Sequence, residues 1–414
     1  MKHGKLMVMM ASVIGLLCAG SGAASDYETQ AAKPVKDAIA PDLATGPDYQ
    51  VNDPVVADGY MYRFNVTSTY GPFQVTGIGA LIKLRQEIWA IGQLKGVTRS
   101  EAFLKAAVDQ AGKPLVFVKD VVTKPVDTLS GIPKGVGRLF SNVATSVTTT
   151  RKPSQESRTK EMLQVGSFKR DYAARYGVDP YSTNPVLQEE LDKIGKAASA
   201  GMWTTSAAMI PISGPAASVL TGTSLAKSFN NILATEPPSR IRNINEEKLK
   251  QMGVSDDGAK RFLDSPVYTP RQSLLLVDSL ARLGSATGRE AYLNAALVAA
   301  DEVEANFFVN TAQILRGYAE TREPITGLTI IRPLAVAQTK SGTAMIPFAL
   351  DYGVWTANAD RLSKQLKTTY RAPGFNTRFE FWVTGTLSPK AKQELEGRGF
   401  KVTEQVGSLF DMVY

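Results

Sequence analysis

One serine and one lysine in this chain stand at a spacing that supports nucleophilic chemistry. Ser224 precedes Lys227 by three residues, so on a helix the amine lies one turn from the hydroxyl and can take its proton. The only histidine, His3, and the only cysteine, Cys18, both lie in the first 18 of the 414 residues. A serine–lysine pair is therefore the sharpest catalytic candidate that this composition leaves.

A second short motif matches the same chemistry. The run Lys340-Ser341-Gly342-Thr343 resembles the Lys-Ser/Thr-Gly strand motif of penicillin-recognising enzymes, which acylate a serine without histidine. Against this, Ser-x-x-Lys arises by chance, and the Ser-x-Asn element of such enzymes is misplaced in this chain. The plain interpretation is a helical residue pair and a hairpin turn that needs glycine. Acyl hydrolysis is the alternative hypothesis, and its residues are Ser224, Lys227, Lys340 and Ser341.

The N-terminal sequence is typical of an export signal. Lys2 and Lys5 precede an uncharged apolar run over residues 6–18. Small residues follow this run up to Ala24, as cleavage by a signal peptidase requires. We predict a cleaved signal peptide over residues 1–24 and a periplasmic location, with lipid attachment at Cys18 as the alternative. The mature chain then lacks imidazole and thiol groups, which excludes Ser-His-Asp triads, disulfides and His- or Cys-ligated zinc.

No sequence motif predicts a cofactor or a metal. The junction Gly77-Ile78-Gly79-Ala80-Leu81-Ile82 joins a strand to a helix, but Ile82 stands where a dinucleotide-binding loop needs its third glycine. Asp301 and Glu304 are neighbours on an expected helix, and we interpret them as part of a solvated face rather than as cation ligands. We therefore expect no cofactor and no metal.

The positive charge of the chain is concentrated in one segment. Residues 124–170 hold nine basic and three acidic residues, which accounts for the net charge that the mature chain retains. This pattern predicts an anionic partner, either a membrane surface or a cell-wall polymer, and a solvated linker is the alternative. We expect no nucleic-acid partner, because no aromatic-rich strand is interleaved with these charges. The candidate surface-binding residues are Lys134, Arg138, Arg151, Lys152, Arg158 and Lys160.

The hydrophobic periodicity predicts an α+β fold with a mainly helical central body. Alternating residues on both sides of Gly71-Pro72 indicate an N-terminal β-hairpin, and an apolar stripe over residues 80–94 indicates the helix that follows it. A long alanine-rich helix is expected over residues 287–318. The last ninety or so residues change to a strand period, and we predict there a hairpin centred on Ser341-Gly342 followed by a βαβ unit.

These patterns divide the chain into six expected parts. They are a signal peptide (1–24), a flexible lead-in (25–58), a hairpin plus helices (59–123), a basic linker or amphipathic segment (124–166), a helical domain (167–325) and a C-terminal α/β module (326–414).

An uncharged stretch over residues 197–226 has two interpretations. Pro211 and Pro215 interrupt it and leave arms of about 14 and 11 residues, each shorter than the roughly 20 residues that span a bilayer. A helical hairpin buried inside the protein and a re-entrant membrane hairpin both fit this pattern.

Two further stretches carry a family resemblance. One is Tyr176-Gly177-Val178-Asp179-Pro180-Tyr181-Ser182-Thr183-Asn184-Pro185, and the other runs from Trp382-Val383-Thr384-Gly385 to Gly399-Phe400. They resemble an uncharacterised family of exported bacterial envelope proteins, a resemblance that implies no activity or ligand. With its localised charge, the chain is best interpreted as a non-enzymatic binding or interaction protein of the cell envelope.

Overall fold

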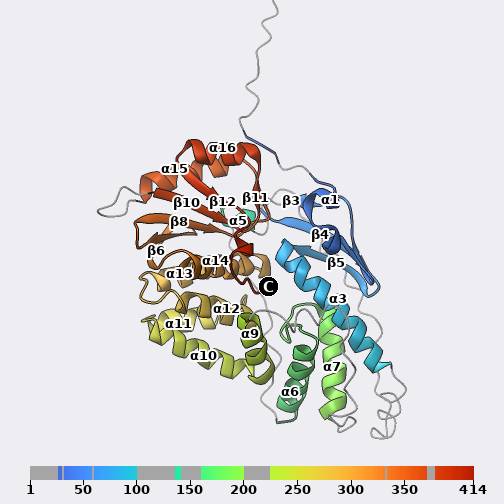
Figure 1. Cartoon of the computed structure of the whole chain (residues 1–414). Coiled ribbons are helices and arrows are strands. Elements are labelled where there is room, and N and C mark those ends of the chain that lie inside the picture. Colours follow the sequence, from blue (N-terminus) through green and yellow to red (C-terminus); the bar gives the residue numbers. More distant parts are fainter. Residues whose placement is uncertain are drawn as a thin grey trace, which may run out of the picture.

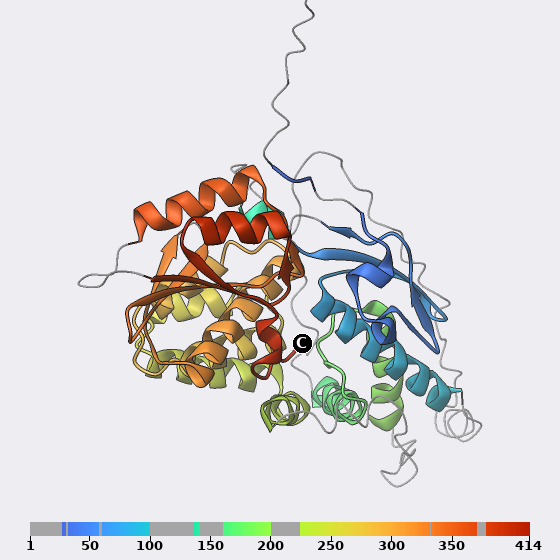
Figure 2. The ribbon, with the colours of Figure 1, turned by 45° about the horizontal axis from the view of Figure 1, so that its top comes forward.

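The chain folds into two lobes that lie side by side, with its last residues between them (Figures 1 and 2). The computed structural model describes residues 27–29, 32–57, 60–99, 136–140, 160–199, 224–331, 333–370 and 378–414. The first lobe contains residues 32–57, 60–99 and 160–199. The second lobe contains residues 136–140 and the chain from residue 224 onward.

The first lobe is built on the hairpin that the sequence predicts. Strands β4 (Tyr62–Ser68) and β5 (Gly71–Thr76) pair antiparallel, and alternate side chains of β4 are buried because successive strand residues face opposite sides. Helix α3 (Ile78–Thr98) follows directly and packs on both strands. Its predicted apolar stripe is buried along one face, at Leu81, Leu84, Ile88 and Ile91.

Residues 32–57, expected to be a flexible lead-in, instead form part of the core of the first lobe. The sheet extends from β4 because β2 and β3 pair with it antiparallel and β1 pairs with β2. Apolar residues spaced among the prolines and aspartates are buried there, including Val35, Leu43, Val51 and Val55. The elements are α1 (Val35–Ala38), α2 (Pro41–Ala44), β1 (Thr45–Gly46), β2 (Tyr49–Val51) and β3 (Val56–Ala57).

The helical pair α6 (Lys160–Arg175) and α7 (Pro185–Ser199) completes the first lobe. The two helices pack against each other, and α7 packs on the C-terminal half of α3, where Leu94, Leu187 and Leu191 share a buried cluster. The region expected to be one helical domain over residues 167–325 is therefore divided between the lobes.

The second lobe stacks helices against one face of a sheet. α14 packs on strand β8, α12 on α14, and α10 on α12, which gives successive layers in Figure 1. The predicted long helix over residues 287–318 is two helices, because the Asp301 side chain accepts the backbone N–H of Glu304 and starts a new one. The helices are α9 (Ser224–Thr235), α10 (Pro238–Gln251), α11 (Asp256–Leu263), α12 (Pro270–Ala281), α13 (Arg289–Ala296) and α14 (Glu302–Thr321).

The C-terminal sheet confirms the predicted α/β module and extends it. Its strand order is β12-β10-β8-β7-β6, in which β8, β10 and β12 are parallel and β6, β7 and β8 form antiparallel neighbours. Helices α15 (Ala357–Thr369) and α16 (Pro389–Gly397) connect the parallel strands on the face opposite α14 (Figure 1). The strands are β6 (Ile325–Ile331), β7 (Leu334–Thr339), β8 (Thr343–Phe348), β10 (Arg378–Val383) and β12 (Phe400–Thr403), and a short pair joins β9 (Tyr352–Gly353) to β11 (Thr386–Leu387).

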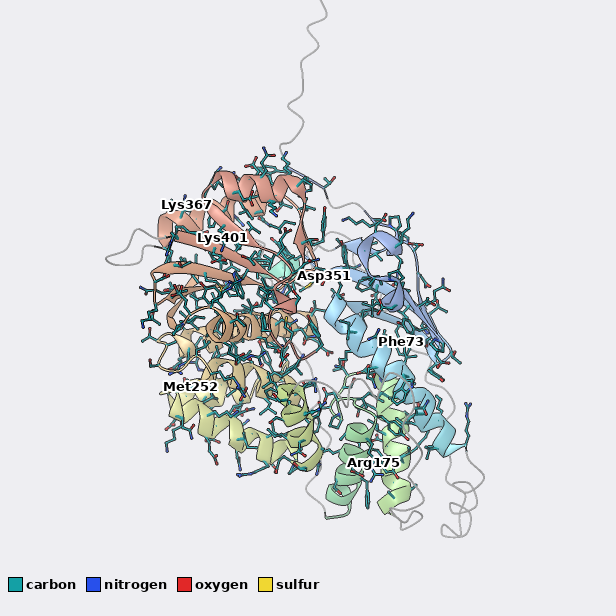
Figure 3. All side chains as sticks on the ribbon, in the orientation of Figure 1. Phe73, Arg175, Met252, Asp351, Lys367 and Lys401 are labelled. Carbon is teal, nitrogen blue, oxygen red and sulfur yellow. The ribbon has the colours of Figure 1, made fainter. Side chains whose placement is uncertain are left out.

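Asp351, which follows β8, joins the two lobes. Its carboxylate accepts the backbone N–H of Tyr62 at 2.9 Å and that of Ile78, the first residue of α3, at 3.1 Å from both oxygens. Its own backbone N–H donates to the Tyr60 carbonyl at 2.8 Å. Figure 3 shows Asp351 at the boundary between the lobes. A negative charge at a helix N-terminus is stabilised by the helix dipole, so one side chain both caps α3 and fixes the second lobe to it.

We expect Asp351→Ala to lower the free energy of unfolding by about 2–3 kcal/mol, because two partly buried backbone N–H groups lose their acceptor. Asp257→Ala is the matched control, since Asp257 is exposed and, within the described residues, forms its ion pair with Arg261 one turn away. We expect it to cost at most about 0.5 kcal/mol. Urea unfolding of the two variants measures the difference. Equal losses would show that Asp351 does not join the lobes.

Candidate functional site

A cleft of about 130 Å³ lies between the lobes, and we call it the interlobe cleft. It opens where β8 and β10 end, the edge of a parallel sheet at which α/β proteins usually bind ligands. Both lobes contribute to it. Its walls come from the start of α3 (residues 76–80) with Lys83, the start of α12 (269–272), the first half of α14 (303–310), the residues after β8 (349–351) and β10 (384–385), and residues 412–414.

The residues that follow β8 and β10 are hydrogen-bonded to each other at the floor of the cleft. The Thr384 hydroxyl donates to the Leu350 carbonyl at 2.7 Å and accepts the Leu350 N–H at 2.9 Å. Gly385 lies so close to the Asp351 carbonyl that a Cβ at this position would overlap it. Glycine is therefore required here by the close approach of two backbones, and this approach holds Asp351 in place.

Two helices begin at the cleft, and one side of a third helix lines it. The lining includes the first turns of α3 and α12 and, from α14, the residues Val303, Asn306, Val309 and Asn310. The N-cap residue of α3, Gly77, has a φ of 99° and supplies no side-chain acceptor, so the first turn of that helix depends on Asp351. The dipoles of α3 and α12 favour negative charge at these ends, although Asp351 already accepts the first N–H of α3 and Thr269 caps α12.

Two cationic side chains add to this potential. Arg271 of α12 donates from Nη2 to the Tyr414 carbonyl at 2.6 Å and from Nη1 to Asn230 Oδ1 at 3.3 Å. Burial lowers the pKa of Arg271, although Asp179 and Glu87 oppose this shift. Lys83 of α3 lies 3.5 Å from Glu302 Oε1.

Carboxylates near Lys83 keep it charged. Burial alone would lower the pKa of Lys83, but the neighbouring Glu87, Glu302 and Asp179 outweigh burial and raise it. Lys83 therefore carries its positive charge at neutral pH, within a group of carboxylates near the start of α3.

The stretch over residues 176–185 lies next to Lys83 and lines the cleft through Asp179. Ser182 donates from its hydroxyl to Glu87 Oε1 at 2.5 Å, and Asn184 donates from its side-chain amide to Glu87 Oε2 at 2.9 Å. Thr183 donates to Glu302 Oε2 at 2.5 Å, across the lobe boundary. Burial raises the pKa of Glu87, and Lys83 and these hydrogen bonds reduce the shift. This stretch thus ties α3 to α14.

The structure does not bring the four candidate catalytic residues into one site. Ser224 and Lys227 are exposed in the first turn of α9, which Figure 1 shows on the far side of α12 and α14 from the sheet. Lys340 and Ser341 lie in the turn between β7 and β8, where the Ser341 hydroxyl donates to Glu323 Oε1 at 2.8 Å. The hairpin-turn interpretation fits this geometry, since Gly342 has a φ of 84°.

Arg138 is the one candidate surface-binding residue whose side chain the structure describes. It donates to both oxygens of Glu304, from Nε at 2.6 Å and from Nη2 at 2.5 Å, and Glu304 is fully buried. The sequence analysis expects the Arg138 charge to face an anionic surface. In the structure, Glu304 neutralises this charge inside the second lobe. Lys160 begins α6, and its side chain lies outside the described residues. Lys134, Arg151, Lys152 and Arg158 lie outside them altogether, so surface binding by them stays a prediction.

Two further expectations fall on residues that the structure does not describe. They are the signal peptide with Cys18, and most of the uncharged stretch over residues 197–226. Among the helices that the structure describes, none has the length and apolar character needed to cross a membrane. Within the same residues, no three histidine, cysteine, aspartate or glutamate side chains gather closely enough to hold a metal ion.

Sequence reasoning missed Lys83, Asp179, Arg271 and Asp351 as site residues. The strand-to-helix junction at Gly77-Ile78-Gly79 was the available signal, because it places a long helix start next to glycines. This junction lacks the third glycine of a dinucleotide-binding loop, because Ile82 stands at that position. The structure shows it as one wall of a cleft built by distant segments.

We expect Arg138→Met to destabilise the protein by about 3–5 kcal/mol, because Glu304 would remain buried without its cation. Arg261→Met, which removes an exposed ion pair with Asp257, should cost at most about 0.5 kcal/mol. Chemical unfolding compares the two variants. A loss for Arg138→Met no larger than that of the control would mean that Arg138 is free to act at the surface.

The raised pKa of Glu87 predicts a pH dependence of stability. The folded state holds this proton to higher pH than the unfolded state, whose ordinary carboxyl pKa is 4.5, so Glu87 costs stability as the pH rises above that value. Glu87→Gln removes this cost, and the stability of the variant relative to wild type should improve between pH 4.5 and pH 8. Urea midpoints at both pH values test this. A pH-independent difference between the two proteins would contradict it.

Comparison of the chain with protein-family models, with curated proteins and with solved structures finds no match.

Proposed function

We propose that this chain is a non-enzymatic binding protein whose ligand is a small anion held in the interlobe cleft. The observation that carries the proposal is the convergence of Lys83 and Arg271 with the starts of α3 and α12 in a single cleft. Each of these features favours negative charge, and they come from both lobes. A bound anion would therefore contact both lobes and strengthen their association.

The size of the cleft supports a ligand with few atoms. Its 130 Å³ is well below the roughly 300–1,000 Å³ of sites for drug-sized molecules. Inorganic phosphate or a short carboxylate matches this volume. Asn306 and Asn310 in the wall have side-chain amide N–H groups that can donate to such a ligand, whereas Gln272 accepts the Thr269 N–H and donates to Asn306 Oδ1.

The carboxylates of the cleft support binding rather than catalysis. Asp351 accepts backbone N–H groups of the first lobe, and Asp179 accepts the backbone N–H of Tyr181 at 2.9 Å. Both side chains are thus engaged in holding the walls together. We propose that this binding takes place in the periplasm, and the predicted export signal supports that location.

We expect Arg271→Met to weaken binding of inorganic phosphate or acetate at least 30-fold, which corresponds to about 2 kcal/mol for the loss of a charge-assisted hydrogen bond. Arg242→Met is the control, because Arg242 pairs with Asp264 at the surface and should leave the affinity unchanged. Isothermal titration calorimetry on the chain from residue 25 to residue 414 measures Kd. The proposal is wrong if wild type binds neither anion, or if Arg271→Met binds as wild type does.

A further inference from the structure

Residues 409–414 return to the interlobe cleft after β12 and are anchored to α14. Phe410 packs on Gly317 so closely that a Cβ there would overlap its ring, and Arg316 donates to the Asp411 carbonyl. Gln313 binds both backbone groups of Val413: its side-chain oxygen accepts the N–H at 2.8 Å and its amide donates to the carbonyl at 3.1 Å. The segment is therefore fixed as far as Val413.

Tyr414 differs from the residues before it. Val413 is 5% exposed, whereas Tyr414 is 39% exposed. Its ring lies on Gly79 at the start of α3, where an added Cβ would overlap it, and its carbonyl accepts from Arg271 at 2.6 Å. The Tyr414 hydroxyl donates to Met412 Sδ at 3.6 Å. Burial of the phenol and the nearby charge of Asp351 raise the pKa of Tyr414 to about 12.

We propose that Tyr414 is an autoinhibitory gate of the anion site. This inference rests on the proposed function and adds its regulation. The Tyr414 carbonyl occupies Arg271 Nη2, and the ring covers the first turn of α3. A small anion uses the same guanidinium and the same helix start, so it binds when Tyr414 turns away about Val413. The competing contact lowers the affinity of the cleft for its ligand.

Two independent substitutions remove the contact between the Tyr414 ring and Gly79, which we expect to hold the main-chain oxygen of residue 414 on Arg271. Tyr414→Ala removes the ring, and Gly79→Ala places a methyl group where the ring lies and forces it out. Gly79 has no positive φ, so alanine is compatible with its backbone conformation in the first turn of α3. We expect each variant to bind inorganic phosphate about tenfold more tightly than wild type. The double variant should gain no more than either single one, because both remove the same obstacle.

Gly96→Ala is the matched control, since Gly96 lies on the same helix with open space around its Cα. It should bind phosphate as wild type does. Calorimetric Kd values for wild type and all four variants decide the question. If wild type binds phosphate and neither Tyr414→Ala nor Gly79→Ala binds it more tightly, the gate is wrong while the binding site stands. If no variant binds any anion, the proposed function fails and the gate fails with it.

Discussion

The carboxylate of Asp351 is the interaction on which the arrangement of the lobes depends. Asp351 follows strand β8 of the second lobe. Its carboxylate accepts the backbone N–H of the first residue of α3 and a backbone N–H of β4, both in the first lobe. Because Gly77 offers no side-chain cap, α3 begins properly only when the second lobe is in place. The first turn of α3 therefore depends on the docking of the two lobes. The cleft exists because this contact sets the start of α3 opposite α12 and α14.

The same contact decides the electrostatic character of the cleft. Asp351 satisfies one N–H group at the start of α3 and leaves the rest of the turn facing the space where Arg271 and Lys83 lie. Acidic residues nearby are engaged elsewhere: Glu87 with Ser182 and Asn184, and Glu304 with Arg138. Asp351 and Asp179 also line the cleft, and both accept backbone N–H groups of its walls. Lys83 and Arg271 are therefore the groups that support a small anion as the ligand.

The sequence predicted local elements well and their long-range assembly poorly. The β4–β5 hairpin, the stripe of α3 and the hairpin turn at Gly342 follow from spacings within a few residues, and the structure has them. The break before α14 was missed because alanine-rich sequence hides the cap at Asp301. The order within residues 32–57 was missed because their apolar residues are buried only by β4 and α3. The cleft was missed for the same reason: Asp351 and Ile78 stand 273 residues apart, and no local pattern joins them.

The most direct test of the account is to map where a small anion binds. Backbone amide chemical shifts, followed by NMR while inorganic phosphate is added to the chain from residue 25 to residue 414, report this residue by residue. The account predicts that the largest changes occur at the starts of α3 and α12, around Gly79 and Arg271. Changes confined to the basic residues between Lys124 and Lys160, with the cleft unaffected, would contradict it and would return the function to the charged segment.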